Sequence, residues 1–485
     1  MSAVRVLAVA AELYPLIKTG GLADVVGALP AALEREGIAT RTLLPGYPQV
    51  VDALCEVEAV HTFAAMHGGP ARVLACRAAG LDLFVLDAPH LYARPGNPYV
   101  GPDGHEWPDN PQRFAALAAA AAAIGRGAVP AFLPDVVHAH DWHAGLAPAY
   151  LYYGGGPRPR TVATVHNLAF QGQYPASLLT ELGLPARAYT PDGVEYYGTI
   201  GFLKAALALA DRITTVSPTY AAEIQTPEHG MGLDGLLRHR SGVLVGIRNG
   251  IDNDLWNPAT DEHLSSRYDA HDLARRSPNK ASLRRRMTLD DDPGAPLFAA
   301  VSRLAWQKGL DLLLAATDGL VASGAQLALI GQGERDLEQG FTAARERHPG
   351  RVGVSIGYDE GLAHLAQAGA DAVLVPSRFE PCGLTQLCAM RYGALPVVAK
   401  VGGLADTVVD VGDSIGGAGR GTGIQFAPVT HDAFRAALER TMAFWREPAA
   451  WRRTQARAMA IDVGWREPAA QYAAIYRSLA ADPVS

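Results

Sequence analysis

The sequence predicts two α/β domains, each built on a parallel sheet that helices cover on both faces. The chain has 485 residues, more than a single compact core usually holds. Short apolar segments alternate with amphipathic segments in both halves, which is typical of parallel strands joined by helices. The turn-rich segment 248–252 separates the two series. We therefore expect two doubly wound, Rossmann-like domains facing across a cleft, the first covering residues 1–247.

The individual elements follow from the apolar periodicity. In the first half we expect strands at 5–10, 135–141, 161–165 and 213–216, and helices at 22–36 and 202–210. In the second half we expect strands at 297–301, 326–330, 352–356, 372–375 and 396–399. Ligands of open α/β sheets bind beyond the carboxyl ends of the strands, so the segments that follow these strands are the candidate site.

Composition excludes several classes of protein. The formal net charge is −7 and the sequence has no long run of Lys or Arg, which argues against a nucleic-acid partner. The four cysteines are scattered, as expected for free thiols in a reducing compartment. The apolar run 6–11 is short and fits a first buried strand better than a secretion signal, and the Ala-rich run 115–123 is too short to span a bilayer. We expect a soluble, cytoplasmic protein without a membrane partner, and the oligomeric state is left open.

The first candidate motif is Lys18-Thr19-Gly20-Gly21-Leu22-Ala23-Asp24. Paired glycines let a backbone approach a ligand closely, and a helix that starts there directs free amides at an anion. Lys18 adds a full positive charge. An ordinary turn with a solvated lysine is the alternative, but we predict a phosphate site. Part of the motif recurs as Gly402-Gly403-Leu404-Ala405-Asp406, again where a strand should pass into a helix.

Two further motifs follow strands in the second half. Arg303 and Lys308 come directly after strand 297–301 and predict a diphosphate site, with a surface ion pair as the alternative. Glu380 precedes Pro381, which suits the first turn of a helix, and the amides of 382–385 would then be free donors. Glu380 could simply cap that helix, but its place at the predicted cleft favours a contact with a sugar or a transition state.

A group of histidines lies near two strand ends. His138, His140 and His143 invite a zinc hypothesis, but no matching cysteine or histidine pair completes a site. We therefore expect no metal. Asp141 and His166, at neighbouring strand ends, are better explained as contacts to sugar hydroxyls and backbone.

Two patterns resemble known motifs but are rejected. Gly331-Gln332-Gly333 begins like a dinucleotide fingerprint, but Asp336 stands where the third glycine belongs. Asp252-Asn253-Asp254 resembles a metal-binding Asp-x-Asp, but it lies in the turn between the two domains.

Taken in order, the motifs resemble those of the bacterial glycogen synthases and plant starch synthases. The resemblance runs essentially from end to end and rests on five motifs, none of which is specific alone. They are Lys18-Thr19-Gly20-Gly21, His140-Asp141-Trp142-His143, Asn249-Gly250-Ile251-Asp252, Ser302-Arg303-Leu304 with Gln307-Lys308-Gly309, and Glu380-Pro381-Cys382-Gly383-Leu384-Thr385-Gln386.

This resemblance implies the glycosyltransferase B fold, ADP-glucose as the donor, glycogen or a maltodextrin as the acceptor, and no metal or other cofactor. It also implies that a final helix within 465–485 returns to complete the first domain, so that the second domain covers 248–464. The implied catalytic residues are Glu380, His166, Asp141 and Lys18. The implied donor-binding residues are Lys18, Gly20, Gly21, Asp24, Tyr99, Asn167, Asn249, Arg303, Lys308, Tyr358, Ser377, Cys382, Gly383, Leu384 and Thr385.

The sequence departs from the family pattern at a few positions. Cys388 stands where the wider retaining superfamily often has a second Glu, and Ala305 and Gln332 replace an expected Thr and a small residue. Three alternatives stay open: a related transferase that uses another nucleotide sugar, an NAD-dependent oxidoreductase, and a glucan-binding protein without activity. The missing glycine disfavours the second, and the presence of all four key polar residues, Lys18, Arg303, Lys308 and Glu380, disfavours the third.

Overall fold

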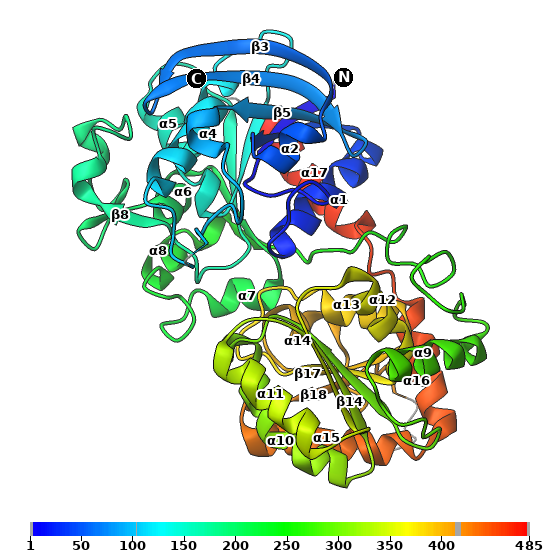
Figure 1. Cartoon of the computed structure of the whole chain (residues 1–485). Coiled ribbons are helices and arrows are strands. Elements are labelled where there is room, and N and C mark those ends of the chain that lie inside the picture. Colours follow the sequence, from blue (N-terminus) through cyan, green and yellow to red (C-terminus); the bar gives the residue numbers. More distant parts are fainter. Residues whose placement is uncertain (1–2, 103, 413–418, 483–485) are drawn as a thin grey trace. The chain divides into compact units, whose positions relative to one another are not determined.

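The computed structural model describes residues 3–102, 104–412 and 419–482, which form two compact units (Figure 1). Unit 1 consists of Met1–Asn249 and Trp465–Ser485, and unit 2 consists of Gly250–Gly464. These units divide after residues 249 and 464, next to the expected divisions after 247 and 464.

The described part of unit 1 is centred on a nine-stranded sheet, which is parallel except at one edge, where β3 and β4 run antiparallel. In spatial order the strands are β12 (Leu244–Gly246), β11 (Arg212–Thr215), β7 (Arg160–Val165), β6 (Val136–His140), β1 (Val4–Val9), β2 (Ile38–Pro45), β5 (Leu81–Asp87), β4 (Gly69–Ala78) and β3 (Cys55–Met66). A small antiparallel sheet has the order β8 (Gln173–Pro175), β10 (Thr199–Gly201), β9 (Glu195–Tyr196).

Helices in unit 1 join and cover these strands. They are α1 (Gly21–Arg35), α2 (Pro48–Asp52), α3 (Pro89–Tyr92), α4 (Asn110–Gly125), α5 (Ala147–Tyr153), α6 (Phe202–Leu209), α7 (Pro218–Glu223), α8 (Asp234–His239) and α17 (Arg466–Ala480). Six predicted elements of this half match β1, α1, β6, β7, α6 and β11 to within two residues at either end. The elements between 38 and 87 were missed. For the edge hairpin β3–β4 the reason is that it has one exposed face and no strong apolar run.

Unit 2 contains a six-stranded, fully paired parallel sheet in its described residues. The strand order is β15 (Val352–Ile356), β14 (Gln326–Gly331), β13 (Leu297–Val301), β16 (Ala372–Val375), β17 (Leu395–Ala399) and β18 (Ile424–Phe426). The helices are α9 (Ser277–Arg286), α10 (Leu310–Ala322), α11 (Arg335–Arg347), α12 (Glu360–Gly369), α13 (Thr385–Arg391), α14 (Gly402–Thr407), α15 (His431–Trp445) and α16 (Pro448–Ala460). Numbered within the unit, this is the order 3-2-1-4-5-6 of the doubly wound dinucleotide-binding fold.

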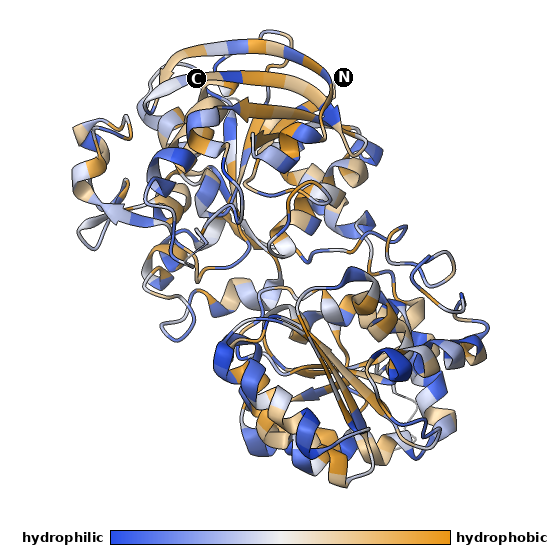
Figure 2. Cartoon of the chain, viewed as in Figure 1, coloured by the Kyte–Doolittle hydropathy of each residue, from blue (hydrophilic) through white to orange (hydrophobic). Residues whose placement is uncertain are grey.

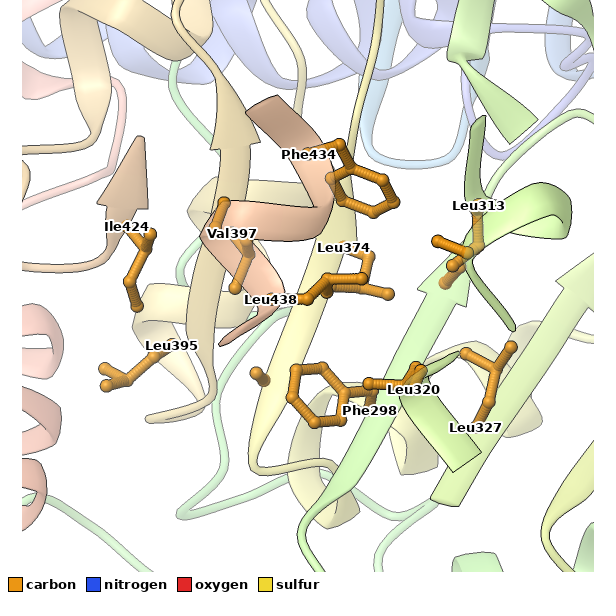
Figure 3. Close-up of a cluster of buried hydrophobic side chains, with 14 of the residues drawn as sticks. Phe298, Leu313, Leu320, Leu327, Leu374, Leu395, Val397, Ile424, Phe434 and Leu438 are labelled. Atoms are coloured by element: carbon orange, nitrogen blue, oxygen red, sulfur yellow. The ribbon is translucent and has the colours of Figure 1, made fainter. Parts of the chain in front are cut away.

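Apolar side chains from both faces of the unit 2 sheet build its core. One cluster packs α10 and α15 on the sheet, and Figure 3 shows Phe298, Leu313, Leu374 and Phe434 converging there. A second cluster on the other face includes Leu283, Leu365 and other residues of α9 and α12. The ribbons of Figure 2 show the same division, with apolar strands and helices that are polar on one side. The predicted fold class, two Rossmann-like α/β domains, is confirmed.

The last helix of the chain belongs to the core of unit 1. Trp465, Tyr472 and Tyr476 of this segment pack among buried residues of β1 and α1, such as Val6 and Leu29. The Tyr476 hydroxyl also bonds His138 Nδ1 of β6, at 2.7 Å. In the part of the chain that is described, no helix combines the length and the apolar character that a membrane span requires.

Candidate active site

The two sheets share a feature that defines where a ligand can bind. In unit 1 the order of the strands reverses between β1 and β6, and in unit 2 it reverses between β13 and β16. At such a switch point the connections leave toward opposite faces of the sheet, which opens a crevice at the carboxyl ends of the two strands. The motifs that contain Lys18 and Asp141 follow β1 and β6, and those that contain Lys308 and Glu380 follow β13 and β16.

Glu12, immediately after β1, organises the first loop. Glu12 is only 3% exposed. The carboxylate accepts hydrogen bonds from the Thr19 amide, from the Thr19 hydroxyl at 2.6 Å and from the Gly20 amide at 3.2 Å. The Tyr99 hydroxyl donates a further hydrogen bond to the same carboxylate. One buried acid thus fixes both the glycine loop and Tyr99, although the sequence analysis did not select it.

The glycine loop presents the start of α1. Gly21 is the first helical residue, Gly20 precedes it without a side-chain cap, and a Cβ at Gly20 would meet no atom within 4 Å. The first-turn amides of a helix have no intrahelical partner, and its dipole favours an anion there. Lys18 lies beside this end and pairs with Asp24 at 2.7 Å, with both side chains about one-quarter exposed. Such a pair adds little stability, so an anionic ligand can compete for Lys18.

Asp141 immediately follows β6 and has a positive φ of 56°, which a residue with a side chain rarely adopts. This conformation turns the chain so that its carboxylate accepts a hydrogen bond from the His166 amide at 2.7 Å. Burial raises the pKa of Asp141 to about 7, although the amides of His166 and Asn167 oppose the shift. Near neutral pH, Asp141 is therefore present in both its protonated and its charged form.

The pKa of Asp141 predicts a pH dependence of stability. Folding raises this pKa from about 4 to about 7, so the stabilising contribution is complete below pH 4 and is lost as the pH rises through 7. Asn has nearly the same size and shape as Asp and cannot titrate, so the Asp141→Asn variant isolates the effect of the charge. The melting temperature of the Asp141→Asn variant, relative to wild type, should therefore increase between pH 5 and pH 8. A difference that stays constant across this range would contradict the shifted pKa.

The histidines near Asp141 form a chain of neutral rings, which is buried at His138 and His140 and half-buried at His166. His138 bonds Tyr476 and Thr164, and His140 Nδ1 lies 2.9 Å from His166 Nε2. Burial lowers the pKa of His140 to about 3 and lowers the pKa of His166 well below its usual value, helped by the neighbouring histidines. No group of three or more His, Cys, Asp or Glu side chains in the described ranges is arranged to hold a metal ion.

Three other residues of unit 1 were predicted to bind the donor. Tyr99 stacks on His143, with ring centroids 4.6 Å apart. Asn167 accepts a hydrogen bond from the Ala169 amide at 3.0 Å and shapes the loop after β7. Asn249 is 7% exposed, and its side-chain oxygen has no hydrogen-bond partner among the described residues. Asn249 follows the edge strand β12 and so lies away from the switch point along the sheet.

The switch point of unit 2 brings Lys308, Glu380 and Ser377 together. Lys308 Nζ lies 2.6 Å from Glu380 Oε2, and the Ser377 hydroxyl donates to the same oxygen at 2.8 Å. The side chains of Lys308 and Glu380 are 20% and 8% exposed. Although these motifs are 72 residues apart in sequence, β13 and β16 are neighbours in the sheet, which makes this cluster possible.

Close backbone packing holds the two loops of this cluster. Gly309 has φ 66°, and a Cβ there would lie 2.0 Å from the Pro376 carbonyl oxygen, so no larger residue fits. The Arg378 amide donates to the Gln307 carbonyl at 2.9 Å. Arg303 lies in the same loop, is exposed, and contacts Gln307 Oε1 at 3.4 Å. The loop thus leaves the Arg303 guanidinium accessible to a ligand.

The helix expected from Pro381 starts later than predicted. Residue 385 is the first of α13, because Gly383 adopts φ 69° and interrupts the backbone. The Gly403 amide, in the repeated glycine motif at the start of α14, instead donates to the Glu380 carbonyl at 3.0 Å and the Pro381 carbonyl at 3.2 Å. Cys382 is buried against Gly403, and Leu384 and Thr385 form the half-buried start of α13.

Tyr358 is set apart from the cluster. It follows β15, which β14 separates from β13, and it is 64% exposed. Its predicted place in the donor site stays a prediction.

The two rejected motifs have structural explanations. A Cβ at Gly331 or Gly333 would lie about 2 Å from the carbonyl of Ser302 or Leu304, so these glycines allow the two loops to pair. The Asp252 carboxylate accepts hydrogen bonds from the amides of Asp254 at 2.9 Å and Leu255 at 3.2 Å, as expected of a turn.

The comparisons with known proteins cover nearly the whole chain. Residues 5–239 match the family described as "Starch synthase catalytic domain", and residues 285–457 match "Glycosyl transferases group 1". The chain is 62% identical over 481 residues to a glycogen synthase of Rhodopseudomonas palustris, covering 99% of this chain and 98% of that protein. It is 61% identical over 479 residues to a glycogen synthase of Methylocella silvestris, covering 99% of both.

Solved structures resemble the chain over the same length. The catalytic domain of starch synthase IV from Arabidopsis thaliana, bound to ADP and acarbose, superposes with a TM-score of 0.89 at 32% identity, covering 99% of this chain and 100% of that one. A sucrose-phosphate synthase from Thermosynechococcus elongatus reaches a TM-score of 0.59 at 17% identity, with 99% of both chains covered, and shares the fold.

Proposed function

This chain belongs to the family of glycogen and starch synthases, and we propose that it transfers glucose from ADP-glucose to the non-reducing end of an α-1,4-glucan, with retention of configuration and release of ADP. The chain is a glycosyltransferase. The observation that best supports the specific reaction is the cluster of Lys308, Glu380 and Ser377 at the switch point of unit 2. A cation, a carboxylate and a hydroxyl held together suit a ligand that carries both a diphosphate and a sugar.

The cations of this site stabilise the leaving group. As the bond between C1 of glucose and the phosphate oxygen breaks, negative charge develops on the departing diphosphate. Arg303 offers a bidentate fork to the phosphates and Lys308 a point charge. In unit 1, Lys18 and the amides at the start of α1 provide a second group suited to an anion. Fixed positive charge of this kind stabilises the transition state more than the ground state.

The groups around Asp141 suit the sugar rather than the phosphate. His166 is neutral near pH 7, so its ring can exchange hydrogen bonds with a hydroxyl without introducing a charge. Asp141 is buried beside it and accepts from its amide. We propose sugar contacts for Asp141 and His166 in unit 1 and, separately, for Glu380 in unit 2, whose carboxylate is held by Lys308 and Ser377.

Retention follows from attack on the same face as departure. The acceptor 4-hydroxyl forms the new bond to C1 while the bond from C1 to the phosphate oxygen breaks, through an oxocarbenium-like state. The acceptor proton passes to the leaving phosphate, which departs as ADP. Arg303 and Lys308 make the diphosphate a better leaving group, and no covalent bond to the enzyme is needed.

The choice of donor provides the direct test. With glycogen as acceptor, the purified protein should form α-1,4-linked glucan from ADP-glucose much faster than from UDP-glucose at equal concentrations. Release of ADP and elongation of the glucan should agree in amount. Transfer mainly from UDP-glucose, or no elongation with either donor, would overturn the proposed reaction.

We also expect the reaction to need no divalent metal. Arg303 and Lys308 supply the charge that a metal provides in many other transferases. The initial rate should therefore be unchanged in excess EDTA, measured after removal of metal from the buffers. A loss of rate that Mg²⁺ or Mn²⁺ restores would contradict this assignment. Asp252-Asn253-Asp254 would then become the candidate metal-binding motif.

A further inference from the structure

Three large apolar side chains are exposed on neighbouring loops of unit 1. Phe170 is 52% exposed, Tyr197 is 79% exposed and Met231 is 37% exposed. We call these three residues the apolar patch. A single exposed apolar residue is ordinary, but a group of them on adjoining segments indicates a binding surface.

Contacts between the loops show that the three residues adjoin. The Gln171 side-chain amide, next to Phe170, donates to the Met231 carbonyl at 3.1 Å. The Tyr196 hydroxyl donates to the same carbonyl at 3.2 Å. A Cβ on Gly232 would lie 3.5 Å from the Tyr197 ring. Met231 is therefore placed between the segments that bear Phe170 and Tyr197.

Two members of the patch occupy backbone positions that large side chains rarely take. Tyr197 has φ 48° and Met231 has φ 49°, each followed by a glycine with positive φ. Tyr197-Gly198 forms the two-residue turn between β9 and β10, where Asn-Gly is the favoured pair. Left-handed backbone costs free energy for Tyr and Met. Such unfavourable positions concentrate at functional sites, where the exposed side chain has a use.

One member of the patch, Phe170, lies on the loop that begins at His166. Phe170 follows His166 by four residues, so their Cα atoms are no more than about 14 Å apart. The Phe170 amide donates to the Asn167 carbonyl at 3.3 Å, which folds the loop back and shortens this span. The loop is also firmly seated, since a Cβ at Gly172 would lie 2.4 Å from the Trp142 ring.

We propose that the apolar patch of Phe170, Tyr197 and Met231 binds the acceptor glucan a few sugar units away from its reacting end. The inference rests on the proposed function. Glucose units present apolar C–H faces that stack on aromatic rings, and hydroxyl edges that take hydrogen bonds. The exposed Gln173, whose amide bonds the Gln171 side chain at 2.9 Å, supplies polar groups beside the patch. An uncharged, repetitive chain fits a surface of this composition.

The proposal predicts a dependence on acceptor length. A short acceptor such as maltotriose occupies the reacting site without covering the patch, whereas glycogen covers both. In the triple variant Phe170→Ala/Tyr197→Asn/Met231→Asn, the KM for glycogen should rise about tenfold, the scale expected of lost aromatic contacts. The KM values for maltotriose and ADP-glucose, and the kcat, should stay within about twofold of wild type. Asn suits a left-handed backbone, so the fold should be preserved.

The test includes a matched control and a readout without catalysis. Tyr152 on α5 is 54% exposed and lies outside the patch, so Tyr152→Asn should leave every constant unchanged. Affinity electrophoresis in glycogen gels, without donor, should show about tenfold weaker retention of the triple variant. If the triple variant misfolds by circular dichroism, Tyr197→Asn alone should still show part of the effect.

The possible failures can be distinguished. An unchanged KM for glycogen and unchanged retention in the triple variant would show that the apolar patch does not bind glucan, whichever nucleotide sugar proves to be the donor. If size-exclusion chromatography shows a dimer for the wild type but a monomer for the triple variant, with unchanged glucan binding, the patch instead contacts a second copy of the chain. A wild-type protein that transfers no glucose overturns the proposed function, whereas glycogen retention that depends on the patch would still support this surface.

Discussion

Replacing Lys308 with alanine is expected to lower kcat/KM for ADP-glucose about 100- to 1000-fold, the effect of removing one preorganised group that stabilises developing negative charge. In the structure Lys308 contacts Glu380 at 2.6 Å, so it can neutralise this carboxylate and the leaving phosphate together. The alanine variant removes both interactions. Glu380, with 8% of its side chain exposed, would then be bonded by Ser377 without its cation.

The size of this effect distinguishes a catalytic contact from a surface charge. Steady-state rates with varied ADP-glucose at saturating glycogen measure it, and the binding of ADP followed by calorimetry separates affinity from turnover. Arg347→Ala is the matched control, because Arg347 forms an exposed ion pair with Asp318 at 3.1 Å, on α11 and α10 of the same unit. Near-normal kcat/KM in Lys308→Ala, with the fold intact, would remove Lys308 from the leaving-group site.

Replacing Tyr476 with alanine is expected to lower the free energy of unfolding of unit 1 by about 3–5 kcal/mol, the usual cost of truncating a buried aromatic residue. Tyr476 is fully buried in the cluster that α17 forms with β1, α1 and β6. Its hydroxyl also bonds His138 Nδ1. The variant therefore leaves both a cavity and an unpaired polar atom under the sheet that positions Asp141.

Hydrogen exchange followed by mass spectrometry measures this effect by region. Peptides of β1 and β6 should lose protection in Tyr476→Ala, whereas peptides of β13 and β16 should not. Tyr476→Phe, which removes only the hydroxyl, should cost about 1 kcal/mol. Phe434→Ala provides the mirrored control, because Phe434 is fully buried in the core of unit 2. Equal loss of protection in both units after Tyr476→Ala would contradict the assignment of α17 to unit 1.

Much of the architecture was accessible from the sequence, because it is encoded over short distances along the chain. The apolar run 297–301 specifies β13, and the polar residues that follow it specify chemistry at its carboxyl end. In a parallel sheet the carboxyl ends of the strands lie at the same edge, so the polar residues that follow different strands come close together. The motifs around Lys18, Asp141, Lys308 and Glu380 were selected in this way, and the structure places all four at the switch points of their sheets.

The tertiary structure alone decided which groups contact each other. Glu12 was missed because its partner Tyr99 is 87 residues away, and no local pattern marks a buried acid that binds a distant hydroxyl. The start of α13 was misjudged because Gly383 takes a left-handed backbone while Gly403 packs against Cys382. The pKa of Asp141 likewise depends on its burial among segments joined only by folding. Periodicity and turn residues act between near neighbours in the chain, whereas burial, hydrogen-bond partners and sheet order depend on contacts between distant segments.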